Sequence, residues 1–231
     1  MRDLTSTTRR AIQPGEVAPD FVLRTVHRDG TVSLADYRGR SALLLAFFRG
    51  IWCPFCRWQI AKLGLAQDKL RAAGVETLAV VASPVERTRA YFQYRPTRVP
   101  VAADPDLVSH RAFGVPQYPV TPKILDALET VKIDVMGELP HPLPVAEAAT
   151  ALEQKDHVEL TAAARRKAEE LTAADDLERE HRFELDTGQF LIDRDGIVRW
   201  VNFELAREGL AAMGKFPTDE ELLAVARAHG V

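Results

Sequence analysis

The chain has 231 residues, 46% of them hydrophobic, and a formal net charge of −3 at pH 7. These values allow one large domain with a substantial core, and the small negative charge gives no sign of a nucleic-acid partner. Because the apolar run Ala42–Phe48 is far too short to span a membrane and Met1–Ser6 lacks the apolar segment of a signal peptide, we expect a cytoplasmic protein without a membrane partner.

The first half of the chain predicts alternating strands and helices. Residues 1–13 are expected to form a flexible tail, and residues 14–231 a single domain interrupted over residues 120–186. The predicted strands here are Phe21–Val26, Thr31–Ser33, Ala42–Phe48, Val75–Ala82 and Val101–Ala103. The predicted helices are Phe55–Ala73, Pro84–Tyr94 with Ser83 as N-cap, and Asp106–Phe113. Strands separated by helices predict right-handed crossovers and a largely parallel sheet core, while Asp29-Gly30 predicts a hairpin turn between the first two strands.

Residues 120–186 interrupt this alternation. Five prolines punctuate the first part, at positions 119, 122, 140, 142 and 144. The second part, Val145–Arg182, is rich in Ala, Glu, Lys and Arg and predicts two or more exposed helices. The insertion is either a solvated cover for a sheet edge, or a lid or dimerisation arm over the cysteine site described below.

The sheet is expected to resume after the insertion. Phe190–Asp193 and Ile197–Phe203 flank Arg194-Asp195-Gly196, which predicts a β-hairpin. Asp219–Ala228 is expected to form a closing amphipathic helix with Thr218 as its N-cap.

The two cysteines of the chain, Cys53 and Cys56, lie between an apolar strand and the helix that follows it. With Pro54 at the first helical position, both sulfurs lie near unpaired backbone N–H groups and the positive end of the helix dipole, which favour thiolate. Arg49 and Arg57 can add positive charge. Lowering a thiol pKa from about 8.5 to about 7 raises the thiolate fraction at pH 7 from about 3% to roughly half. The spacing therefore predicts thiol redox chemistry.

Other roles for the pair fit the sequence less well. A structural zinc site normally needs four ligands, yet there is no second cysteine pair, and the six histidines lack zinc-finger spacing. A permanent disulfide is disfavoured in a reducing compartment. We expect no metal and no cofactor, which leaves two inert buried cysteines as the structural alternative.

Several motifs together resemble the alkyl hydroperoxide reductase and thiol-specific antioxidant (AhpC/TSA) family of peroxiredoxin-like proteins. They are Asp20-Phe21, Phe47–Gly50 with Trp52–Arg57, Asp104–Asp106 with Phe113–Val115, and Phe190–Gly196. The resemblance covers roughly Pro14–Pro119 and Thr187–Phe203. It implies a thioredoxin-like α/β three-layer sandwich, here with an N-terminal β-hairpin and a helical insertion.

The resemblance also implies an antioxidant oxidoreductase that reduces hydroperoxides through a dithiol/disulfide cycle. A thioredoxin-like protein or a low-molecular-weight thiol would serve as reductant, and family analogy allows a homodimer. Arg49 or Arg57 would lower the thiol pKa and hold the leaving oxygen. Trp52, Pro54 and Phe55 are expected to line the surface that receives the substrate.

The sequence leaves the attacking cysteine open. An ungapped match to peroxiredoxins places Cys56 on the peroxidatic cysteine, and it predicts that dimedone labels Cys56 in a Cys53→Ser variant. The order found in thioredoxins instead makes Cys53 the nucleophile. Pro122, after Thr121, is a candidate for the cis-proline of thioredoxins. A thioredoxin-type protein disulfide reductase and a non-catalytic redox-sensing module are the alternative functions.

Overall fold

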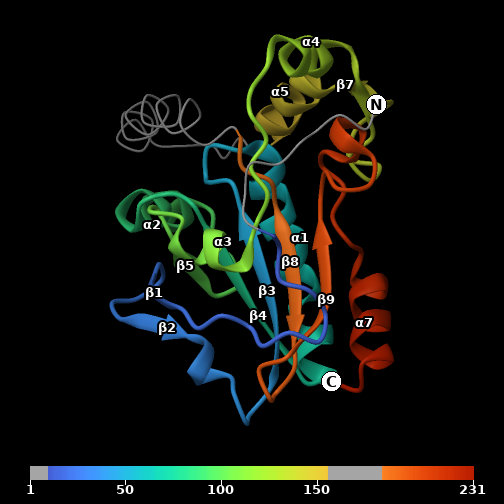
Figure 1. Ribbon diagram of the computed structural model, residues 1–231. Helices are drawn as coiled ribbons and strands as arrows, with labels where there is room; N and C mark the ends of the chain where they lie inside the picture. Colours follow the sequence, from blue (N-terminus) through green and yellow to red (C-terminus); the bar gives the residue numbers. More distant parts are fainter. Residues whose placement is uncertain (1–9, 156–183) are drawn as a thin grey trace.

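A computed structural model describes residues 10–155 and 184–231, so the first part of the predicted tail and most of the second part of the insertion lie outside it. One mixed seven-stranded sheet organises the described chain, in the order β2-β1-β5-β4-β3-β8-β9 (Figure 1). Its strands are β1 (Val22–Thr25), β2 (Thr31–Ser33), β3 (Ala42–Phe48), β4 (Val75–Val81), β5 (Val101–Ala103), β8 (Gly188–Ile192) and β9 (Val198–Phe203). The predicted strands are therefore all present, with small shifts at their ends.

The centre of the sheet is parallel, as the alternation of strands and helices predicts. The pairs β3–β4 and β4–β5 are parallel, whereas β1, β2, β8 and β9 join the sheet through antiparallel pairs. The physical reason lies in the connections: two tight hairpins, at Asp29-Gly30 and at Arg194–Gly196, can join only antiparallel strands.

The central strand β3 is buried along its whole length because both faces of the sheet are covered. Leu44, Ala46 and Phe48 face the core beneath α1 (Pro54–Ala72) and α7 (Asp219–Ala228). The alternate residues belong to a second core on the opposite face, with Phe113 and Phe190. Two covered sheet faces make the three-layer α/β sandwich that the resemblance implied.

The local signals explain most helix ends. Thr218 caps α7 in a capping box with Glu221, and α1 ends just before Gly74, whose φ of +81° suits glycine. The predicted N-cap Ser83 is wrong: Pro84 caps α2 (Val85–Tyr94), while the Ser83 hydroxyl accepts the N–H of Ile51. The remaining helices of this part are α3 (Val108–Phe113) and the short 3-10 turns η1 (Leu34–Asp36) and η2 (Gly209–Ala212).

The described part of the insertion packs on the body of the protein. It comprises α4 (Pro122–Thr130), β6 (Lys132–Ile133), β7 (Leu143–Pro144) and α5 (Val145–Lys155), and β6 pairs with β7 in a separate two-stranded sheet. The helix α5 contacts α1 and α4 and buries Val145, Ala148 and Leu152. The expectation of an exposed helix is therefore wrong for one face of α5, whose apolar residues pack on the body of the protein.

Pro122 does not take the predicted cis-proline role. It lies at the start of α4 with Thr121 as N-cap, and residues 10–155 and 184–231 contain no cis peptide bond.

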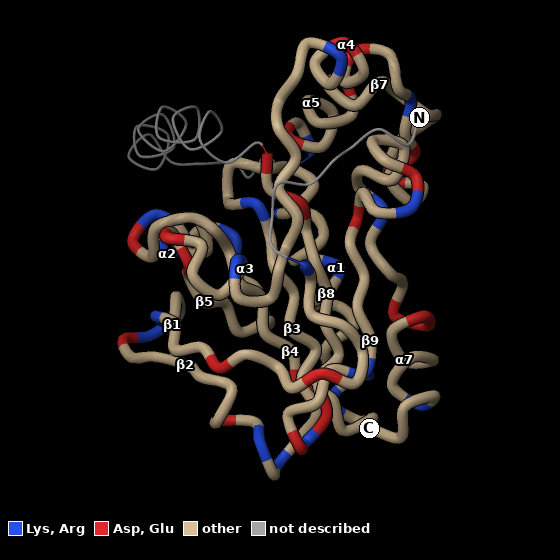
Figure 2. Tube along the Cα trace, viewed as in Figure 1, with Lys and Arg blue, Asp and Glu red and all other residues tan. Residues whose placement is uncertain are grey.

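No helix in these same residues is long and apolar enough to cross a membrane. Figure 2 shows basic and acidic positions interspersed along the described chain, in keeping with its small net charge.

Candidate active site

Cys53 is the N-cap of α1, as the sequence predicts, and both cysteines are free thiols. Its sulfur accepts the backbone N–H of Cys56 at 3.4 Å, and Pro54 fills the first helical position. Cys53 and Cys56 are 2% and 0% exposed, so neither sulfur lies on the open surface. The Cys53 sulfur thus replaces water as the partner of an N–H group at the helix start.

The surroundings separate the acidities of the two thiols. Burial raises the pKa of Cys53, but hydrogen bonding from the Cys56 thiol and the charge of Arg49 bring it down to about 7. Burial and this donation to Cys53 raise the pKa of Cys56 well above its usual value. One thiolate is therefore favoured at neutral pH, and it resides on Cys53. This favours the thioredoxin order over the assignment of attack to Cys56 by the ungapped match.

Arg49 is a buried cation, 3% exposed, that follows β3 directly. Its Nη2 lies 2.5 Å from Glu204 Oε2 and 3.6 Å from an oxygen of Asp186. The other oxygen of Glu204 accepts the side-chain N–H of Gln59 at 2.9 Å and the backbone N–H of Gly214 at 2.8 Å. Burial by itself lowers the pKa of Arg49. The neighbouring carboxyls and thiols raise this pKa by more, so Arg49 retains its charge.

Strand register brings this cluster together. Phe47, Gly188 and Phe203 lie in one row across the antiparallel strands β3, β8 and β9. Arg49, Asp186 and Glu204 lie just beyond that row and so meet at one edge of the sheet. Sequence reasoning missed both carboxylates, since more than a hundred residues separate them from the cysteines. It also missed Gln59, which lies close to the cysteines in the sequence but whose partner, Glu204, does not. The available signal was an acidic residue at each end of the predicted β-hairpin.

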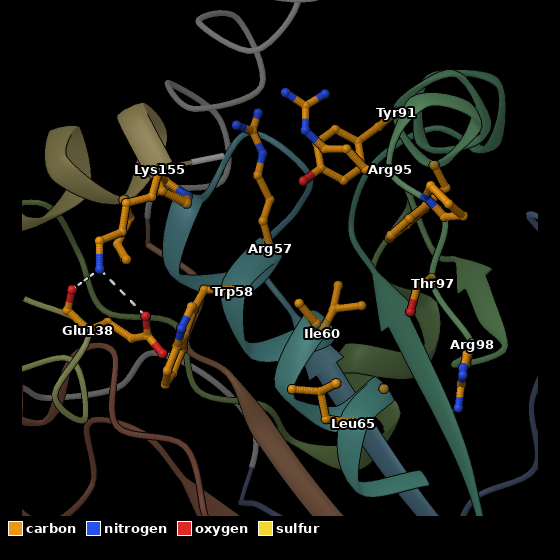
Figure 3. A pocket seen from close by; sticks show the side chains of 16 residues that line it. Arg57, Trp58, Ile60, Leu65, Tyr91, Arg95, Thr97, Arg98, Glu138 and Lys155 are labelled. Atoms are coloured by element: carbon orange, nitrogen blue, oxygen red, sulfur yellow. Dashed lines mark hydrogen bonds and ion pairs between the residues drawn. The ribbon is translucent and has the colours of Figure 1, made fainter. Parts of the chain in front are cut away.

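Arg57 lies in a different environment. Its Nε donates to the carbonyl of Ile51, and its guanidinium lies 5.0 Å from the centre of the Tyr91 ring, as does that of Arg95. It lines a cavity of about 570 Å³ next to α1 and α2, where Lys155 contacts Glu138 (Figure 3). Only Pro54 among the described residues lines both this cavity and the one at Cys53.

The cavity at Cys53 has a volume of about 330 Å³. Arg49, Trp52, Pro54 and Phe55 line it beside the sulfur, so the structure brings together most of the residues that the sequence singled out. Residues of α4 and α5 form its remaining wall with Met213. Substrate contact by Trp52, Pro54 and Phe55 stays a prediction.

A buried histidine supports the end of β3. His110 Nδ1 lies 2.7 Å from Asp104 and Nε2 3.3 Å from the carbonyl of Phe48. The ring thus bridges the Asp104 carboxylate and the backbone at the end of β3. Burial raises the pKa of Asp104, but hydrogen bonds from His110 and Ser109 outweigh this effect and hold that pKa well below its usual range. The sequence assigned His110 no role, yet it fixes the backbone next to Arg49.

Asp186 makes the stability of the protein depend on pH. Burial and the charge of Glu204 raise its pKa to about 7 despite Arg49, whereas an unfolded Asp titrates near 4. The native state therefore retains a proton between about pH 4 and 7, and the free energy of unfolding falls as pH rises through that window, by up to about 4 kcal/mol.

We expect Asp186→Asn to remove this loss, because an amide cannot ionise. Urea denaturation at pH 5 and pH 8 should show a smaller stability decrease in the variant than in the parent chain. Asp106→Asn, at an exposed carboxyl, is the matched control and should keep the parent's decrease. If stability fell equally between pH 5 and pH 8 in Asp186→Asn and in the parent, ionisation of Asp186 would not be the cause of the loss.

Within residues 10–155 and 184–231, no group of three or more His, Cys, Asp or Glu side chains is arranged to hold a metal ion. Around Cys53 the structure gathers two buried thiols, a buried guanidinium and two buried carboxyls.

Comparison with known proteins points to one family. The AhpC/TSA family matches residues 14–140. Among solved structures, the chain is similar to peroxidoxin BcpB from Mycobacterium tuberculosis, with a TM-score of 0.55 and 14% identity over 94% of this chain and 97% of that one. It is also similar to reduced 2-Cys peroxiredoxin from Plasmodium vivax, with a TM-score of 0.55 and 15% identity over 93% and 94% of the two chains. At these identities the likeness establishes the fold. None of the curated proteins compared with the sequence matches it.

Proposed function

This chain belongs to the AhpC/TSA family, and we propose that it is a thiol peroxidase that reduces hydroperoxides with Cys53 as nucleophile and Cys56 as resolving thiol. The family and the fold support a thiol-dependent redox function. One observation supports the peroxidase in particular. Cys53 has a thiol with a pKa of about 7, and this residue lines a cavity large enough for a small molecule.

In the first step, the Cys53 thiolate attacks the terminal oxygen of a hydroperoxide. The S–O bond forms as the O–O bond breaks, which gives Cys53 sulfenic acid and an alkoxide that takes up a proton from water. Arg49 lines the cavity, and its Nη1 has no hydrogen-bond partner in the described chain. It is therefore the donor available to stabilise the leaving oxygen.

In the second step, the Cys56 sulfur attacks the sulfenic sulfur. A disulfide forms and the hydroxyl leaves with the Cys56 proton as water. Cys56 lies in the first turn of α1, and its thiol already donates to the Cys53 sulfur, so little movement is needed. An external dithiol then attacks the disulfide, returns both cysteines to thiols and is itself oxidised to a disulfide.

The surroundings of Cys53 favour a small substrate. Cys53 is 2% exposed, and the cavity that it lines is bounded by residues of α4 and α5. A protein disulfide needs a nucleophile at an open surface, whereas a hydroperoxide needs only a cavity. A thioredoxin-type disulfide reductase is the second candidate, since the more acidic thiol is the first cysteine of the pair.

Rapid mixing of the reduced protein with hydroperoxide tests the proposal, with tryptophan fluorescence as the signal, because Trp52 lines the cavity beside Cys53. We expect a peroxide-dependent fluorescence change, followed by loss of both free thiols at one equivalent of peroxide. An insulin-reduction assay on the same sample tests the second candidate. Unchanged thiols after exposure to both hydrogen peroxide and an organic hydroperoxide would rule out the peroxidase.

A further inference from the structure

We propose that Asp186 is a redox-linked proton site: its carboxyl holds a proton while Cys53 is a thiolate and releases that proton when Cys53 is oxidised. The inference rests on the proposed peroxidase function and adds the source of a proton to the same reaction. Asp186 does not line the cavity at Cys53 and acts through its neighbour Arg49, so it is a positioning residue and not a catalytic one.

Three acidic groups surround one buried cation. Glu204 Oε2 lies 2.5 Å and Asp186 Oδ1 lies 3.6 Å from the same nitrogen, Arg49 Nη2. Arg49 also lines the cavity of Cys53, and its charge favours the thiolate there. All four side chains are buried, so solvent screens the charges between them far less than it does at the surface. One positive charge therefore lies among three groups that can each be negative.

The other groups that face Asp186 keep one charge state near neutral pH. Its carboxyl accepts two backbone N–H groups, at 2.7 and 3.3 Å, which do not titrate. Burial raises the pKa of Tyr118 to about 12, so this neighbour stays neutral. Burial also raises the pKa of Cys56 well above its usual value, so this group stays a thiol. Of the described groups named here, Asp186 and Cys53 are the two that change charge close to pH 7.

Ionisation of either group opposes ionisation of the other. While Cys53 is a thiolate, Asp186 shares the single cation with Glu204 and with that thiolate, which favours its protonated form. A sulfenic acid or a disulfide at Cys53 is neutral, so oxidation removes one anion and leaves Arg49 to the two carboxyls. Asp186 then ionises at a pH where the reduced protein keeps it protonated. Its pKa, raised by burial to about 7, places this change in the neutral range.

This release balances the protons of the peroxidase reaction. The Cys53 thiolate and a hydroperoxide give a sulfenic acid and an alkoxide, which takes one proton from water. The sulfenic acid and the Cys56 thiol then give a disulfide and water, with no further proton exchanged. Asp186 returns one proton to water as it ionises. Conversion of the dithiol to the disulfide therefore takes up less than one net proton from the solution.

A pH indicator in weakly buffered solution measures this uptake when the reduced protein reacts with hydrogen peroxide at pH 8. We expect the parent to take up less than about half a proton per disulfide formed, and Asp186→Asn about one, because an amide has no proton to release. Asp106→Asn, at an exposed carboxyl, is the matched control and should keep the parent's value. Equal uptake by the parent and Asp186→Asn would overturn the proposal.

Infrared difference spectra between the dithiol and disulfide forms give an independent measurement. We expect oxidation of the parent to remove the C=O stretching band of a protonated carboxyl, and to remove no such band from Asp186→Asn. If Asp186→Asn fails to fold, Glu204→Gln replaces it. That variant leaves Arg49 to Asp186 alone, so the carboxyl is ionised in both forms and proton uptake rises to about one.

Diamide, which oxidises thiols without a peroxide, separates this proposal from the proposed function. A protein whose thiols are unchanged by every hydroperoxide would lack the peroxidase activity. A carboxyl band that is the same before and after oxidation by diamide would instead overturn the redox-linked role of Asp186 and leave the peroxidase standing.

Discussion

Replacement of Cys53 by serine is expected to lower peroxide reduction by at least about a thousandfold, since a serine hydroxyl is far less ionised and less nucleophilic than a thiol with a pKa of about 7. Cys56→Ser should keep the first oxidation step and lose turnover, because no thiol remains to resolve the sulfenic acid. The measurement is single-turnover peroxide consumption by each variant, with thermal denaturation to show that both fold.

Dimedone trapping with mass spectrometry identifies the attacking sulfur. We expect the label on Cys53 in Cys56→Ser and none in Cys53→Ser. The ungapped match to peroxiredoxins predicts the reverse, a label on Cys56 in Cys53→Ser. Because burial and donation to its neighbour raise the pKa of Cys56, that outcome would contradict the roles derived from the structure.

Arg49→Met is expected to destabilise the protein by about 3–5 kcal/mol and to raise the pKa of Cys53. The protein loses stability because the substitution leaves the buried Glu204 carboxylate without its cation. It also removes the charge that helps to lower the Cys53 pKa. Urea denaturation at neutral pH measures the first effect, and the pH dependence of thiolate absorbance measures the second.

Two further variants separate these effects. Arg24→Met removes an exposed arginine paired with exposed Glu86, and it should change stability by less than about 1 kcal/mol. Adding Glu204→Gln to Arg49→Met removes the orphaned charge and should restore most of the lost stability. Since Glu204 raises the pKa of Cys53, this double variant should also have a lower Cys53 pKa than Arg49→Met alone. A single variant as stable as the parent would refute the buried pair as a structural support.

The cysteine site was largely predictable because its signals are local. Helix-start chemistry placed Cys53 at the N-cap and Pro54 at the first turn, and the structure confirms both. Likewise, hairpin turns and apolar runs located the strands to within a few residues. The antiparallel pairs β1–β5 and β3–β8 could not be predicted, because each joins strands that are far apart in the sequence.

The acidity of each thiol could not be predicted from the sequence. Cys53 and Cys56 share one short motif, and both lie near the same helix start. Their pKa values diverge because the Cys56 thiol donates to Cys53 and because a particular buried cation lies near them. That cation is held by Glu204, 155 residues away in the chain, so only the register of β3, β8 and β9 explains it.

The sequence by itself determined the pair of neighbouring cysteines, its place at a helix start and the α/β class of the fold, since these depend on neighbours within a few residues. Tertiary structure alone decided which sulfur ionises, which carboxyl stays protonated near neutral pH and what encloses the cavity at Cys53. These properties depend on desolvation and on charges brought together across the sheet, and neither is encoded in the spacing of residues along the chain.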